Sequence, residues 1–251
     1  MKDVLTGRTG GNPLFLEESL RTLVETGALV GASGGYRLAK PLGNIHVPPT
    51  VQAILAARID HLAPEEKHLL QCAAVVGKDV PYALLAGIAA ESEERLRTLR
   101  AHLQAAEFLY ETSLFPALEY TFKHALTHEV AYGGLLQDAR RRLHAAIVGA
   151  MEDLYAGRLS EQAERLAHHA VRGEAWEKAV THLWQAGRNA RARSAYRQAV
   201  GFLEQAAEIL TRLPDTAGRE ALHLAFLPKR LGSVRSFGES EDSFFDFSGE
   251  S

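Results

Sequence analysis

The sequence predicts a mainly α-helical protein with one small β-hairpin near its middle. Apolar residues recur at helical spacing through most of its 251 residues. Aromatic and polar residues alternate in two neighbouring runs, 108–111 and 119–122, separated by 113–116, and this alternation predicts a hairpin. Three predicted helices precede the hairpin, and helix, helix, helix, strand, strand is the order of a winged helix, a variant of the helix-turn-helix.

The N-terminal part is expected to be a helix, a short hairpin and a second helix. Asn12 suits an N-cap and Pro13 the first helical position. Glycine-separated apolar residues over 29–38 favour a hairpin. Thr50 is expected to cap a helix that covers 51–62.

The winged-helix part follows directly. Helices are expected over 64–76, 82–88 and 91–107, with a break at 77–81. The second strand of the hairpin then leads straight into another helix. His124 therefore sits at a strand-to-helix corner, where a side chain can face a ligand.

The remaining pattern is helical and repetitive. Connections of two to six residues force antiparallel neighbours among the expected helices, 124–136, 138–155, 160–172, 174–191 and 194–213. Small and large residues fall on the packing positions of a tetratricopeptide-like unit of about 34 residues. These positions are Leu183, Ala186, Gly187, Ala190, Ala199, Leu203 and Ala206. Leu183 stands where Trp is usual, so a generic helical bundle is the alternative.

Two other pairs of residues on these helices have structural interpretations. His168 and His169 point to different helix faces and are expected to flank a packing seam. Trp176 and Trp184 lie two turns apart on one helix, and this spacing predicts that they belong to the core.

Composition limits the classes of function. With 46% hydrophobic and 24% charged residues, the chain has the composition of an ordinary soluble globular protein. Its net charge of -3 argues against a general nucleic-acid binder. Cys72 is the single cysteine, so no disulfide can form within the chain, which suits a reducing compartment. The chain has no apolar signal sequence and no apolar run of about 18 residues. We therefore expect a cytoplasmic protein without membrane contact.

Three blocks carry a resemblance to a known family. They are Gly11-Asn-Pro-Leu-Phe-Leu-Glu-Glu18, Val47-Pro-Pro-Thr-Val-Gln52 and Tyr120-Thr-Phe-Lys-His-Ala-Leu-Thr-His-Glu-Val-Ala-Tyr132. In this order they resemble the STAND group of signal-transduction NTPases, from about Gly7 to Pro214. The resemblance is closest to large bacterial proteins in which an AAA-type ATPase precedes tetratricopeptide helices, often behind a class III adenylate or guanylate cyclase domain.

The resemblance implies two nucleotide contacts. Gly11, Asn12 and Pro13 match the motif in the family's ATPase lid that lies against the nucleotide base. His124 matches the winged-helix histidine that reaches the β-phosphate of ADP and holds the inactive state closed. Without a nucleotide role, Pro13 is a plain helix-opening proline and His124 a corner histidine bonded to backbone.

The resemblance also implies a division of the chain. Residues 1–46 correspond to a lid helix and hairpin, 47–136 to the winged helix, 137–226 to the tetratricopeptide-like helices, and 227–251 to a divergent tail that we expect to be disordered. On this interpretation the chain is the C-terminal part of such a protein, and the ATPase domain is supplied in cis or in trans.

The chain lacks the signatures of ATP hydrolysis. No Gly-x-x-x-x-Gly-Lys-[Ser/Thr] occurs, and no apolar strand ends in the acidic residues of a magnesium site. We therefore expect no catalytic residues, no enzyme activity and no cofactor bound by this chain alone, whereas the intact family protein would use ADP or ATP with Mg²⁺. His124 and His128 share a helix face, but no third ligand lies nearby in sequence, so no metal site is expected.

Three functions remain open at this point. The first is a regulatory part of a STAND ATPase, with a nucleotide-sensing arm and repeats that bind a protein partner or signal. The second is a nucleotide-independent interaction scaffold. The third is a DNA-binding regulator, which the acidic residues of the third helix, Glu91, Glu93, Glu94 and Glu107, argue against.

Overall fold

The computed structural model describes residues 12–25, 27–31, 35–39, 50–113 and 117–213. The chain divides into two compact units, Met1–Gln137 and Asp138–Ser251, which we call unit 1 and unit 2. The described residues are mainly helical with two small antiparallel sheets, which confirms the predicted fold class at that level. Gly11, the 46/47 boundary and the tail over 227–251 lie outside the described residues.

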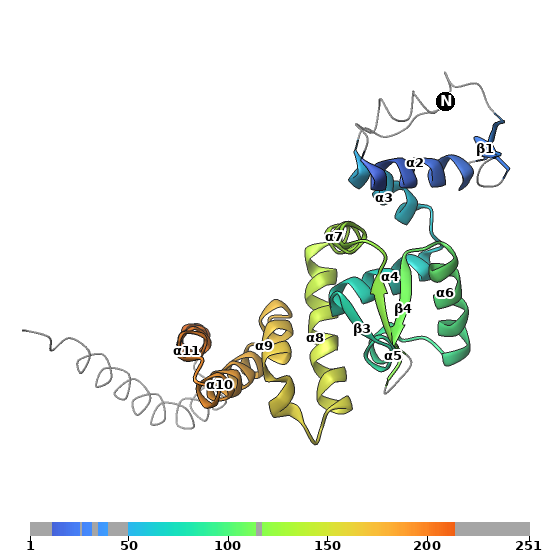
Figure 1. Cartoon of the computed structure of the whole chain (residues 1–251). Helices are drawn as coiled ribbons and strands as arrows, with labels where there is room; N and C mark the ends of the chain where they lie inside the picture. Colours follow the sequence, from blue (N-terminus) through green and yellow to red (C-terminus); the bar gives the residue numbers. More distant parts are fainter. Residues whose placement is uncertain (1–11, 26, 32–34, 40–49, 114–116, 214–251) are drawn as a thin grey trace, which may run out of the picture. The chain divides into compact units, whose positions relative to one another are not determined.

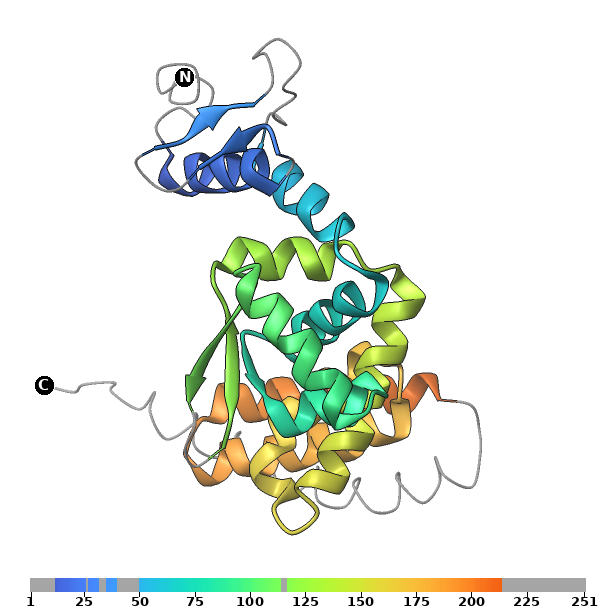
Figure 2. The same cartoon turned by 90° about the vertical axis from the view of Figure 1, so that its right-hand side faces the viewer.

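Unit 1 begins with α2 (Pro13–Glu25), which opens as the sequence predicts. The Oδ1 atom of Asn12 accepts a hydrogen bond from the backbone N–H of Phe15 at 3.2 Å. Two short strands, β1 (Leu29–Val30) and β2 (Arg37–Leu38), pair antiparallel alongside α2 (Figure 2). Together these elements form the predicted helix and hairpin.

A second capped helix follows the first hairpin. The hydroxyl of Thr50 accepts from the backbone N–H of Ala53 at 3.2 Å, and α3 (Val51–Asp60) begins at the next residue. Apolar side chains of α2 and α3 pack against Leu126 and Val130, which lie on a later helix, α7 (Ala125–Gly133). The N-terminal turn of α2 is thereby anchored to the helix that begins directly after His124.

The rest of unit 1 contains helices α4 (Pro64–Val76), α5 (Tyr82–Ala89) and α6 (Glu93–Ala105) and a three-stranded sheet. Strands β4 (Leu109–Ser113) and β5 (Glu119–Phe122) form the predicted hairpin. The prediction of a plain break at 77–81 was incomplete, because β3 (Asp79–Pro81) pairs antiparallel with β5. Pro81 is compatible with this position because β3 is an edge strand.

The sheet order β3-β5-β4 makes β5 the central strand. Its side chains Tyr120 and Phe122 are buried, and their rings pack edge-on against Tyr82 of α5 and His128 of α7, respectively. A central strand with a packed face is the most constrained part of such a sheet. The two residues after it, Lys123 and His124, therefore start from a fixed position.

Unit 2 is built from helices only within its described residues. They are α8 (Gln137–Leu154), a 3₁₀ turn η2 (Leu159–Gln162), α9 (Ala163–Arg172), α10 (Trp176–Ala192) and α11 (Tyr196–Arg212). Helix α10 packs against both α9 and α11 (Figure 1).

The turns before α10 and α11 are alike. Glu174 and Ser194, 20 positions apart, both take left-handed backbone conformations, with φ of 53° and 60°. In each turn the next residue, Ala175 or Ala195, donates its backbone N–H to a carbonyl of the preceding helix at 2.9 Å. The α9–α10 and α10–α11 connections therefore have the same local structure.

The seven predicted repeat-packing residues lie along α10 and α11. All are buried except Leu203, which is half-buried beside Gly187. A Cβ on Gly187 would lie 3.0 Å from Cγ of Leu203, so the glycine permits a close approach of the two helices. The prediction that Trp176 belongs to the core was wrong: it opens α10 with 40% of its surface exposed.

No helix among the described residues combines the length and the apolar character needed to cross a bilayer.

Candidate functional site

The corner between β5 and α7 places His124 as the sequence predicts. Lys123 continues the sheet, donating its backbone N–H to the carbonyl of Phe108 at 3.2 Å. His124 is still extended, with φ of -134° and ψ of 140°, and α7 begins at the next residue. Its carbonyl accepts from the N–H of Thr127 at 3.0 Å, but its ring makes no capping bond. The imidazole is therefore available for another contact.

The ring of His124 is partly buried, and its Nε2 atom is buried with no hydrogen-bond partner among the described residues. A buried polar atom without a partner is uncommon and commonly marks a missing water, ion or ligand. His128, one turn later, is different: its Nε2 lies 2.9 Å from the carbonyl oxygen of Ala74 and its ring packs on Phe122. Of the two histidines, only His124 has an unused buried nitrogen.

Carboxylates from α2 face His124. Glu17, Glu18 and His124 each offer a possible ligand atom, and these atoms all lie within 4.8 Å of one another. Two carboxylates and an imidazole are a donor set that can hold a divalent cation. Both carboxylates are, however, already paired with basic side chains, which lowers their attraction for a metal ion.

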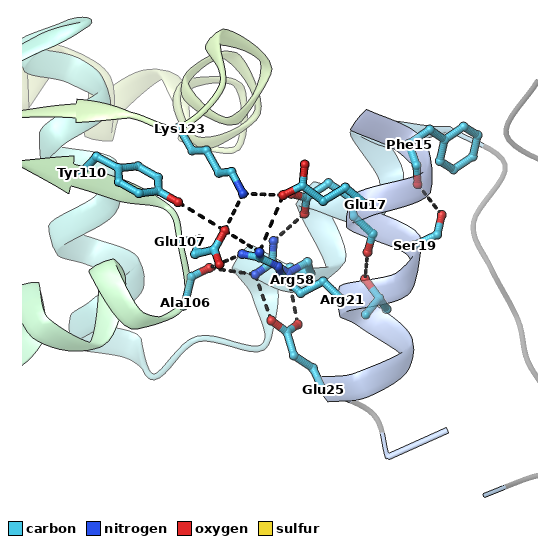
Figure 3. A network of polar contacts seen from close by, with 12 residues as sticks. Phe15, Glu17, Ser19, Arg21, Glu25, Arg58, Ala106, Glu107, Tyr110 and Lys123 are labelled. Atoms are coloured by element: carbon cyan, nitrogen blue, oxygen red, sulfur yellow. Dashed lines mark hydrogen bonds and ion pairs between the residues drawn. The ribbon is translucent and has the colours of Figure 1, made fainter. Parts of the chain in front are cut away.

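The basic partners belong to a wider polar network, shown in Figure 3. Lys123 donates to both Glu17 and Glu107. Arg21, on α2, forms an ion pair with Glu107 and donates to the carbonyl of Ala106 at 3.3 Å. We call this set the polar network; its members are Glu17, Glu18, Arg21, Glu25, Arg58, Ala106, Glu107 and Lys123.

The ionisation of the network follows from these contacts. Hydrogen bonds from Lys123 and Arg21 lower the pKa of Glu107 to about 2. A hydrogen bond from Lys123 likewise lowers the pKa of Glu17. Burial tends to lower the pKa of Lys123, but its hydrogen bonds to Glu107 and Glu17 outweigh burial and raise it. The three side chains are therefore all charged at neutral pH.

Arg58, on α3, is the buried centre of the network. Its guanidinium binds Glu18, donates to Glu25 at 3.0 and 2.8 Å, and donates to the carbonyl of Ala106 at 2.9 Å. It also lies 4.7 Å from the ring centre of Phe108. Two arginines thus contact the carbonyl of Ala106, the C-cap residue of α6, where the helix dipole favours positive charge.

The structure places the predicted nucleotide-contacting residues on two packed elements. Asn12 and Pro13 are exposed at the start of α2, and His124 precedes α7, against which the first turn of α2 packs. Lys123 lay inside a recognised sequence block but was not singled out. Nothing in the sequence connects Glu17 with Lys123, 106 residues away.

Unit 2 contains a second notable polar contact. The Nδ1 atoms of His144, on α8, and His169, on α9, lie 2.8 Å apart, and both side chains are buried. Burial and neighbouring positive charge lower the pKa of His144 to about 4 and that of His169 to about 3. Both rings are neutral at pH 7, so one Nδ1–H donates to the bare Nδ1 of the other.

Comparisons with known proteins add one relative. The chain is 28% identical, over 236 residues, to an uncharacterised protein of Rhizobium meliloti (strain 1021). The match covers 90% of this chain but only 22% of that protein, so the similar region is a small part of a much longer relative. No family model matches the chain, and no solved structure matches it.

Proposed function

We propose that this chain is a regulatory part of a STAND-type ATPase signalling protein, in which His124 senses the phosphates of bound ADP. The observation that carries the proposal is the buried, unpartnered Nε2 of His124 at the end of the central strand β5. An imidazole N–H can donate a hydrogen bond to a phosphate oxygen, which suits a reversible contact.

The architecture supports the winged-helix and repeat assignments on which this proposal depends. Helices α4, α5 and α6 are followed by the β4–β5 hairpin, with β3 added at the sheet edge. In unit 2, the close α10–α11 approach at Gly187 is the kind of contact that small residues allow in tetratricopeptide repeats.

The proposed mechanism is a two-state switch. ADP, held mainly by an ATPase domain supplied in cis or in trans, would also bind His124, and exchange for ATP would release the arm and permit oligomerisation. The helices of unit 2 would bind a protein partner or signal. The chain itself would not hydrolyse ATP, since the lysine loop and magnesium ligands would come from the ATPase domain.

The first test is a thermal melt of the chain with and without millimolar ADP and Mg²⁺. A ligand that binds only the folded state raises the midpoint by mass action, so wild-type protein should shift by a few degrees. His124→Ala should abolish the shift. His102→Ala, which removes an exposed histidine paired with Glu66 on the surface of the same unit, should keep it. Equal shifts in wild type and His124→Ala would reject the role of His124, whereas no shift in either would mean that ADP binding needs the ATPase domain.

A nucleotide-independent scaffold is the second candidate. It is favoured by two exposed aromatic side chains, Trp176 and Tyr196, at the equivalent first positions of α10 and α11. Exposed aromatic residues are common anchors in protein interfaces. Partner binding that is unaffected by ADP and lost in Trp176→Ala with Tyr196→Ala would favour this function.

DNA binding is the weakest candidate. The carbonyl of Ala106, the C-cap residue of the third winged-helix helix, α6, is bound by Arg21 and Arg58, and the first turn of α6 carries Glu93 and Glu94. Acidic residues at that end oppose phosphate contacts. Salt-dependent binding of duplex DNA would be needed to revive this candidate, and a flat titration at low salt would reject it.

A further inference from the structure

Three basic side chains converge where α2 meets the end of β5. Lys123 and His124 are consecutive after the central strand, and Arg21 lies on α2 and shares Glu107 with Lys123. Each of the three groups can bind phosphate oxygens. Yet all three face carboxylates: Glu17 and Glu107 bind Lys123, and Glu17 and Glu18 flank His124.

We propose that Lys123 joins His124 as a phosphate contact and that Glu17 is an internal competitor that occupies this site when no nucleotide is bound. The inference rests on the function proposed above and adds the regulation of the same site. Glu17 is suited to the role because it lies on α2, whereas Lys123 and His124 belong to the sheet and its following corner.

The geometry sets Glu17 and a phosphate in competition. In the arrangement described, Nε2 of His124 is buried, and Glu17 and Glu18 of α2 lie close to the ring, so a phosphate oxygen can reach Nε2 only after this packing opens. Nζ of Lys123 is bound by two carboxylate oxygens, from Glu17 and Glu107. A phosphate that binds both groups therefore competes with the carboxylate of Glu17, which binds Lys123 and lies within 4.8 Å of the possible ligand atom of His124.

The charges permit such an exchange. Glu17 contributes one negative charge, whereas a terminal phosphate carries close to two and offers three acceptor oxygens. Because hydrogen bonding from Lys123 lowers the pKa of Glu17, the competitor stays ionised through neutral pH. Release therefore depends on a competing anion or on movement of α2, and not on protonation of Glu17.

Two acids of unit 1, Glu17 and Glu129, provide a matched experiment. Glu17→Gln removes the competing charge but keeps the shape of the side chain. Glu129→Gln makes the same change in net charge on the exposed face of α7, so it controls for a general electrostatic effect. Pyrophosphate is the probe, titrated calorimetrically into the whole chain at low salt with EDTA, because it tests phosphate contacts without the nucleotide base.

Glu17→Gln is expected to bind pyrophosphate about five- to tenfold more tightly than wild type, a typical coupling between competing contacts. Glu129→Gln should match wild type, and adding Lys123→Met to Glu17→Gln should remove the gain. A thermal melt of each variant checks that it folds. If Glu17→Gln binds no more tightly than Glu129→Gln, including the case in which neither binds, the competitor role is rejected.

Adding His124→Ala separates this inference from the proposed function. If the gain in Glu17→Gln persists without His124 but requires Lys123, the competitor role of Glu17 stands and the role of His124 fails. If His124→Ala abolishes the ADP shift but Glu17→Gln gives no gain, the proposed function stands and the competitor role fails.

Discussion

Arg58 is the residue on which the polar network depends most. Only 3% of its side chain and 2% of that of Glu18 are exposed, so the two charges compensate each other away from water. Arg58→Ala should lower the free energy of unfolding by about 3–5 kcal/mol, because it leaves the charge of Glu18 buried and unpaired. Urea unfolding followed by circular dichroism measures the loss.

The double variant Arg58→Met with Glu18→Leu tests the reason for that loss. It removes both charges, so most of the stability should return. Arg212→Ala is the control, since its pair with Glu208 is exposed and should contribute little. A double variant as unstable as Arg58→Ala would show that the other contacts of Arg58, to Glu25 and Ala106, matter more than the compensation of Glu18.

At the residue scale, the sequence predicted those features that depend on residues close together in the chain. Asn12 and Thr50 were identified as caps because a cap and the N–H it accepts are three residues apart. His124 was placed at its corner because a strand pattern changes there into a helix pattern. The links from Arg58 to Glu18 and from Lys123 to Glu17 were not predictable, since each joins distant segments through charged residues that usually remain on the surface.

At the scale of elements, the helices and the β4–β5 hairpin follow from periodicity, but β3 does not. The segment Asp79–Pro81 has only three residues and ends in proline, so it is too short to show the alternation of apolar and polar residues that predicts a strand. Only the tertiary pairing of Asp79, Val80 and Pro81 with β5 makes it one. That pairing makes β5 central, and thus fixes the residues that lead into the candidate site.

Three glycines of unit 2 test how closely its helices pack. A Cβ on Gly173 would lie 2.6 Å from the backbone nitrogen of Ala145, one on Gly187 3.0 Å from Leu203, and one on Gly201 more than 4 Å from any neighbour. Gly201→Ala should raise the free energy of unfolding by about 0.5–1 kcal/mol, because alanine restricts the unfolded chain.

The other two substitutions should destabilise, because overpacking costs about 1–3 kcal/mol. The loss in Gly187→Ala should lie at the low end of this range, because the side chain of Leu203 can shift. The loss in Gly173→Ala should lie at or above the high end, because the backbone that faces it cannot shift. Urea midpoints measured by tryptophan fluorescence give the order. Equal effects at Gly173 and Gly201 would contradict the close approach of α8 and the α9 terminus.

At the scale of the whole molecule, both units should lose stability as protons bind, but in different pH ranges. His144, His168 and His169 of unit 2 have pKa values lowered by burial and by positive neighbours that include Arg140, Arg165 and Arg172. Their neutral forms stabilise the fold, so the unfolded state binds more protons below about pH 6.5. Unit 2 should lose stability as the pH falls from about 6.5 toward about 4, the pKa of His144.

Unit 1 depends on carboxylates instead. The pKa of Glu107 is lowered to about 2 from an ordinary value of 4.5, so its stabilising effect is complete above pH 4.5 and is lost as the pH falls toward 2. Glu17, whose pKa is also lowered, acts in the same direction. Acid should therefore unfold the chain in two steps, unit 2 before unit 1.

The positions of the tryptophans make the two steps separable. The chain has two tryptophans, Trp176 and Trp184, and both belong to unit 2, so their fluorescence reports that unit alone while far-ultraviolet circular dichroism reports both. The fluorescence transition should occur at the higher pH. Replacing the buried pair, with His144→Phe and His169→Leu, should move it to lower pH and leave the second step in place. Coincident transitions in the wild-type chain would mean that the units unfold together and that the histidine pair does not set the acid stability of unit 2.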